Sequence, residues 1–96
     1  MPTAKLKKSR QHAYIAQDGR CHYCDAPMWI FGPEELTEPF AVDIEEAYRL
    51  QCTAEHLLPR SEGGQDGRHN IVAACLHCNW TRHHRFTEPP DPARYR

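Results

Sequence analysis

The sequence predicts one small α+β domain in which two short strands and a helix are tied to an N-terminal helix by four cysteines. The chain has 96 residues, which is enough for a single domain, 1–96, with a modest core. Apolar runs broken by glycines over the central part, 52–86, indicate strand, loop, strand and helix. One Cys-x-x-Cys pair precedes that segment, and a second pair lies within it, at the start of the predicted helix.

The chain before the central part predicts two ordered pieces. Residues 4–17 carry a partial apolar helical face, and Gly19 marks the end of that helix. A basic start without an apolar stretch behind it gives no sign of export or of a membrane segment, so the expected location is the cytoplasm. Residues 28–31 form a short apolar run that a strand would accommodate.

Acidic side chains are concentrated in one insertion, residues 32–50. It holds six of them against one arginine, whereas the net charge of the whole chain is only −1. Pro33 and Pro39 favour a loop over residues 32–40, and residues 43–50 predict a short helix. We expect no chemistry from this insertion. The basic ends of the chain leave room for a positive face toward phosphates.

The central part predicts strands over 51–57 and 70–74, joined by a glycine-rich loop over 59–69. A helix follows from Leu76 to about residue 86. Three prolines then indicate a tail over 87–96.

Four cysteines have the spacing of a closed tetrahedral zinc site: Cys21, Cys24, Cys75 and Cys78. Structural zinc contributes about 10–16 kcal/mol of apparent binding energy, compared with a net domain stability of about 5–15 kcal/mol. The sequence therefore predicts a zinc ion that decides whether the chain folds. Two redox pairs are the alternative, although no thioredoxin-like pattern accompanies them. His22 or His77 could replace a cysteine ligand, and Cys52 is expected in the core.

The central motifs resemble the HNH endonuclease family. The first motifs are a carboxylate followed by histidine (Glu55-His56), a proline (Pro59) and paired glycines (Gly63-Gly64). They are followed by Asn70-Ile71-Val72 and by a Cys-x-x-Cys-Asn motif, Cys75-Leu76-His77-Cys78-Asn79. The resemblance covers residues 52–85, and the upstream cysteine pair is similar to the zinc-bearing branch of the family. It implies a ββα-metal fold and hydrolysis of phosphodiester bonds in DNA, with double-stranded DNA as the expected partner.

The resemblance also implies a role for each site residue. His56 is the expected general base, because an ordinary histidine pKa of about 6.5 leaves the side chain largely neutral at working pH. Asn70 is expected to tie down the loop that orients the base. Glu55, Asn79 and His83 are the expected ligands of a catalytic Mg²⁺ or Mn²⁺. His84 could stand in for His83, and Asn79 occupies a position where colicin-type members have histidine.

Arginines around the motif are expected to contact DNA phosphates, namely Arg60, Arg82 and Arg85. The family's helix lies along the minor groove, so we expect low sequence selectivity. Leu76 and Trp80 are expected in the core, and His12 and His69 are expected to have no role in the chemistry.

Two other classes of protein remain open at this point. A zinc-stabilised module that binds nucleic acid without cutting it would keep the fold, although the full set of motif residues argues against this. A redox or zinc-storage protein would leave the motif outside the cysteines unexplained. Oligomeric state, biological role, and cleavage of one or both strands stay open.

Overall fold

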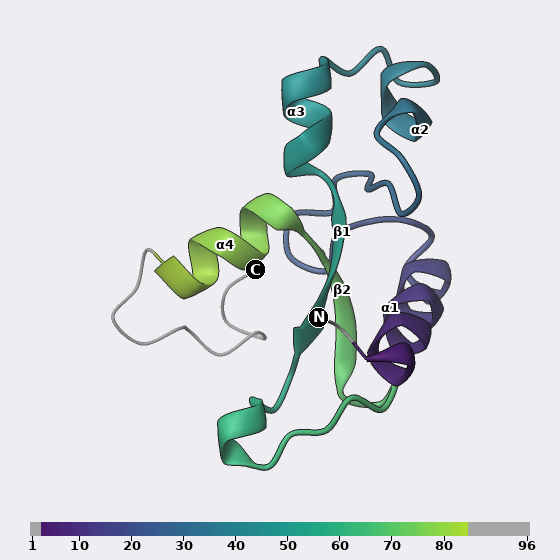
Figure 1. Cartoon of the computed structure of the whole chain (residues 1–96). Coiled ribbons are helices and arrows are strands. Elements are labelled where there is room, and N and C mark those ends of the chain that lie inside the picture. Colours follow the sequence, from purple (N-terminus) through teal and green to yellow (C-terminus); the bar gives the residue numbers. More distant parts are fainter. Residues whose placement is uncertain (1–2, 85–96) are drawn as a thin grey trace.

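The structure, a computed structural model, describes residues 3–84. Figure 1 shows the two strands in the middle, with α1 on one side, α4 on the other, and α2 and α3 together at one end. The elements in chain order are α1 (Ala4–Ala16), α2 (Glu34–Thr37), α3 (Ile44–Arg49), β1 (Cys52–His56), the 3-10 helix η1 (Arg60–Glu62), β2 (Ile71–Cys75) and α4 (Leu76–His84). The predicted α+β class is confirmed. The proline-rich tail and the predicted helix end near residue 86 lie outside the described residues.

The sheet consists of β1 and β2, which pair antiparallel. Their register places Cys52 opposite Cys75 and His56 opposite Ile71. The linking loop, residues 57–70, therefore reverses the chain so that β2 pairs with the strand that precedes it. This pairing brings the end of β1 beside the start of β2 and the beginning of α4 beside the start of β1.

The N-terminal helix α1 forms where the apolar pattern predicted it. Thr3 caps its N-terminus by accepting a hydrogen bond from the backbone N–H of Leu6. Asp18 and Gly19 then adopt positive φ angles of 57° and 73°, which end the helix. The helix packs on both strands and buries Ser9 and Ala13.

The apolar run at residues 28–31 does not form a strand. Trp29 makes one isolated bridge to Gln51, and its indole N–H donates instead to the carbonyl of Ala47 in α3, 2.7 Å away. This side-chain contact fixes α3 against the run. Trp29 therefore anchors the insertion through its side chain, while its backbone hydrogen-bonds to Leu50 and Cys52 at the start of β1.

The loop predicted over residues 32–40 is wrong at its centre, where α2 forms. The carboxylate of Glu35 accepts hydrogen bonds from the backbone N–H groups of Phe31 and Gly32, both at 2.9 Å. Acidic residues also favour the first turn of a helix because its N-terminus carries partial positive charge. Pro33 occupies the N-cap position and Pro39 follows the end of α2, so neither proline interrupts the helix.

The core is made largely of small residues and sulfur atoms. Its buried members are Ala13, Cys21, Tyr23, Met28, Cys52, Ala73, Ala74, Cys75 and Cys78. Small domains with modest cores are commonly stabilised by an added cross-link such as a metal site. Cys52, 1% exposed, is a core residue as predicted. No helix among residues 3–84 is both long and apolar enough to cross a bilayer.

Candidate metal centres and general base

The cysteine cluster consists of Cys21, Cys24, Cys75 and Cys78. Their sulfurs all lie within 4.8 Å of one another, and those of Cys24 and Cys75 are 3.9 Å apart. A tetrahedral ion with Zn–S bonds of about 2.3 Å holds its sulfurs about 3.8 Å apart. The four cysteines are therefore positioned to bind a metal ion.

Burial and contacts among these thiols shift their pKa values. The hydrogen bond with the Cys75 thiol lowers the pKa of Cys21 to about 4, and the same pairing raises the pKa of Cys75. Burial raises the pKa of Cys78 to about 12. Each thiolate disfavours the next, so four ionise together only around a cation. Such a donor set suits Zn²⁺, whose binding deprotonates cysteine.

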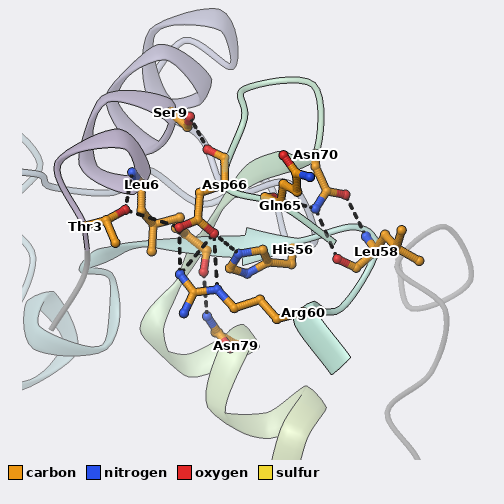
Figure 2. A network of polar contacts seen from close by, with 11 residues as sticks. Thr3, Leu6, Ser9, His56, Leu58, Arg60, Gln65, Asp66, Asn70 and Asn79 are labelled. Atoms are coloured by element: carbon orange, nitrogen blue, oxygen red, sulfur yellow. Dashed lines mark hydrogen bonds and ion pairs between the residues drawn. The ribbon is translucent and has the colours of Figure 1, made fainter. Parts of the chain in front are cut away.

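His56, the last residue of β1, faces the linking loop. Its Nε2 lies 2.8 Å from Oδ1 of Asp66, and both side chains are largely covered, at 18% and 16% exposure. Arg60 donates to the same carboxylate, with its Nη2 2.8 Å from Oδ2 (Figure 2). The hydrogen bond from His56, and next that from Arg60, lower the pKa of Asp66 despite partial desolvation.

Asn70 closes the linking loop with its side-chain amide. Its Oδ1 accepts from the backbone N–H of Leu58 at 2.8 Å, and its Nδ2 donates to the carbonyls of Leu58 and Gln65 at 3.1 and 2.8 Å. Both partners belong to the loop that follows His56 (Figure 2). The amide thus joins the two ends of the loop, because Leu58 begins it and Gln65 lies near its return.

The side chain of Glu55 points to α4, where it contacts Arg82 and His83. Nη2 of Arg82 lies 3.0 Å from Oε1 of Glu55, and each of these side chains is only 4% exposed. Nε2 of His83 lies 3.2 and 3.3 Å from the two carboxylate oxygens. Burial disfavours the guanidinium charge, but the hydrogen bonds and charge of Glu55 outweigh it and raise the pKa of Arg82.

The spacing of Glu55 and His83 suits two neighbouring ligands of one ion. Donors at about 2.1 Å from an octahedral Mg²⁺ and at right angles to each other lie about 3.0 Å apart. Asn79 stands one turn before His83 on α4 and so shares its face. The Asn79 Nδ2 donates to Thr53 Oγ1 on β1 at 3.0 Å, and its amide oxygen is a donor type that hard cations take.

The side chains of Glu55 and His56, neighbours at the end of β1, contact different parts of the protein. Glu55 contacts α4, whereas His56 contacts the linking loop, as the alternation of side chains along a strand requires. Among the described residues the structure joins Glu55 to His83, and it holds Asn79 against β1. It places His56 with Asp66 and Arg60, and not in hydrogen-bond contact with Glu55.

The arginines predicted to contact phosphates differ in their placement. Arg60 is 56% exposed on η1, whereas the Arg82 side chain is buried against Glu55 and does not face solvent. Arg85 and the side chain of His84 lie outside the described residues. Leu76 and Trp80 were predicted in the core, and this was wrong, since they are 41% and 58% exposed. The small core is already filled by residues of β2 and the cysteine pairs.

Asp66 is the site residue that sequence reasoning missed. The available signal was a carboxylate between two glycine positions, four residues before Asn70 and within reach of a histidine across the loop. Asp in a glycine-rich loop usually serves a turn, so the residue type alone did not single it out. Its partner is ten positions away, and only the closed loop brings the two together.

Comparison with known proteins assigns the central part of the chain. The family model described as HNH endonuclease matches residues 39–85. This range holds both strands, α4 and the positions of Glu55, His56 and Asn70, and it leaves α1 and the first cysteine pair outside. No curated protein and no solved structure shows a significant match to the chain.

Proposed function

The chain carries an HNH endonuclease domain over residues 39–85, and from that premise we propose that it is a metal-dependent endonuclease that hydrolyses phosphodiester bonds of double-stranded DNA. The observation that carries the proposal is the contact of Glu55 with His83 across β1 and α4, at 3.2 and 3.3 Å. An oxygen and a nitrogen donor at this spacing, with Asn79 on the same helical face, make a mixed and open ligand set. The cysteine cluster is closed by comparison and is proposed to hold Zn²⁺ as a structural ion.

The divalent ion, proposed as Mg²⁺ or Mn²⁺, would neutralise charge that develops on the phosphate and on the leaving oxygen. Glu55, Asn79 and His83 would hold it. The ring nitrogen of His83 that faces Glu55 would have to be unprotonated to act as a ligand. Arg82 stays beside Glu55 and offsets its charge within the protein.

His56 is proposed as the general base that takes a proton from the attacking water. A neutral imidazole is suited to this because its ordinary pKa is about 6.5. Asn70 supports it by closing the loop that begins directly after the strand.

Binding to DNA is proposed to rest on phosphate contacts. The guanidinium of Arg60 is exposed although its Nε and Nη2 pair with Asp66, and it is proposed to contact a phosphate, as is Arg85. Within residues 3–84 there is no second unit that would read bases. We therefore propose low intrinsic sequence selectivity.

The experiment is cleavage of supercoiled plasmid by the zinc-loaded protein, with and without Mg²⁺ or Mn²⁺. The proposal expects nicked or linear DNA only when the divalent ion is present, and a rate about 10²–10⁴-fold lower for the His56→Ala variant at equal protein concentration. A protein that retards the plasmid on a gel yet leaves it intact with either ion would instead be a zinc-stabilised nucleic-acid-binding module. That result would refute the proposed activity.

A further inference from the structure

Asp66 lies at the centre of a network that joins the proposed base to three other parts of the protein (Figure 2). Its Oδ1 is 2.8 Å from Nε2 of His56 and 3.0 Å from Nη2 of Arg60. Its Oδ2 is 2.8 Å from the same Nη2 and 3.2 Å from Oγ1 of Thr3. Its backbone carbonyl accepts a hydrogen bond of 2.6 Å from Oγ of Ser9.

A neutral histidine carries its proton on one ring nitrogen and can accept a proton only at the other. An ionised carboxylate is an acceptor only, so a carboxylate beside Nε2 favours the tautomer with hydrogen on Nε2. This tautomer leaves Nδ1 of His56 with its lone pair for the water. We propose that Asp66 is a positioning residue that fixes the tautomer and the ring orientation of His56, an inference that rests on the proposed function.

The contacts around Asp66 keep its carboxylate in this state. The hydrogen bonds from His56 and from Arg60 lower its pKa, so it is ionised at neutral pH. Arg60 binds it through two nitrogens, with Nε 3.2 Å from Oδ1. If Arg60 turns to a DNA phosphate, Thr3 and the backbone contacts still hold the carboxylate in place.

The backbone on which Asp66 stands is held from two directions. Ser9 in α1 is only 5% exposed, and its hydroxyl fixes the carbonyl of Asp66. On the other side, Nδ2 of Asn70 donates to the carbonyl of Gln65 at 2.8 Å. The helix α1 lies outside the segment that matches the family, residues 39–85, yet it supplies Thr3 and Ser9 to this network. It thereby takes part in setting the orientation of the base.

The decisive measurement is the tautomer of His56, read from the ¹⁵N shifts of its ring nitrogens by NMR. The zinc-loaded protein is used without added Mg²⁺, at a pH well above the ordinary histidine pKa of about 6.5. The wild type is expected to show hydrogen on Nε2 and a bare Nδ1. Asp66→Ala is expected to show a mixture of tautomers, and Asp66→Glu to recover the wild-type tautomer in part. Glu62→Ala, which removes an exposed carboxylate from η1, serves as the matched control and should leave the His56 shifts unchanged.

Plasmid cleavage provides the second measurement. Asp66→Ala is expected to lower kcat about 10- to 100-fold, as loss of an orienting hydrogen-bond partner commonly does. The Mg²⁺ concentration for half-maximal rate and the zinc content should stay at wild-type values. Ser9→Ala should lower kcat less, because the carboxylate itself is retained.

Two outcomes would overturn the inference. One is a wild-type His56 with hydrogen on Nδ1, and the other is an Asp66→Ala protein with both the wild-type tautomer and the wild-type rate. A protein that cuts no DNA but shows the expected change of tautomer would refute the proposed endonuclease activity and leave the positioning role of Asp66 supported.

Discussion

Glu55 on β1 and Arg82 on α4 form an ion pair that is shut off from solvent, with Nη2 3.0 Å from Oε1 and each side chain 4% exposed. The guanidinium also lies over the ring of Tyr23, 6.0 Å from the ring centroid. In the sequence, Tyr23 stands between the two cysteines of the first pair. The ion pair therefore links the proposed divalent-ion site to the cysteine cluster. Loss of this ion pair should lower both the stability and the activity of the protein.

Replacing Arg82 should destabilise the protein strongly. Arg82→Met leaves the Glu55 carboxylate buried without its guanidinium, and removal of one partner from a buried pair costs about 3–5 kcal/mol. Arg60→Met is the control, because it removes a guanidinium that is 56% exposed, and pairs made by exposed side chains contribute little. Urea unfolding of the zinc-loaded proteins measures both losses. Equal losses for the two variants would show that the buried pair has no special weight.

The cysteine cluster should hold about one equivalent of zinc in protein purified without added metal. Cys24→Ser and Cys75→Ser should lose the ion and unfold, because zinc binding is coupled to folding in such sites. Cys52→Ala changes a buried cysteine outside the cluster and should keep both zinc and fold. Elemental analysis and circular dichroism provide the readouts. A folded, monodisperse Cys75→Ser protein without zinc would contradict this prediction.

Variants of the proposed base and of the proposed ligands should fail in different ways. His56→Ala should keep zinc, fold and DNA binding while losing about 10²–10⁴-fold in rate, the usual contribution of a general base. His83→Ala should instead raise the Mg²⁺ or Mn²⁺ concentration needed for half-maximal cleavage, because a ligand is removed and the base remains. Glu55→Gln should behave like His83→Ala, and it is preferable to Glu55→Ala because it leaves an acceptor for the buried Arg82.

Titration of each ion against the cleavage rate separates these three variants. The assignment of the base would be wrong if His56→Ala cut at the wild-type rate. The assignment of the ligands would be wrong if His83→Ala and Glu55→Gln needed no more metal than the wild type.

DNA affinity should fall steeply with salt and depend little on sequence. Each neutralised phosphate contributes a slope of about 0.9 log units of affinity per log unit of salt. Arg60→Ala should reduce that slope by about 1, whereas Arg49→Ala in the acidic insertion should leave it unchanged. Fluorescence anisotropy with unrelated duplexes at several salt concentrations tests this. One sequence bound and cut far better than all others would argue for base readout.

Local patterns in the sequence were sufficient for the main elements, although not for α2 or the 28–31 run, and for the cysteine cluster. Helix α1, the two strands and α4 follow from apolar periodicity and from glycines, both of which act over a few residues. The cluster follows from the spacing within each cysteine pair, since a metal ion demands a fixed number of donors. The family also followed from motif residues within one short segment, and its match to residues 39–85 confirms that prediction.

Tertiary structure decided which side chains meet. The contacts of Arg82 with Glu55 and of Asp66 with His56 join residues that are 10 or more positions apart in the sequence. The exposure of Trp80 depends on how the small core is filled. Residue type does not specify such partners, because an arginine suits a phosphate or a buried carboxylate equally well. The helix α1 shows the same point: its sequence predicts a helix, and only its packing on the linking loop makes Ser9 and Thr3 part of the site.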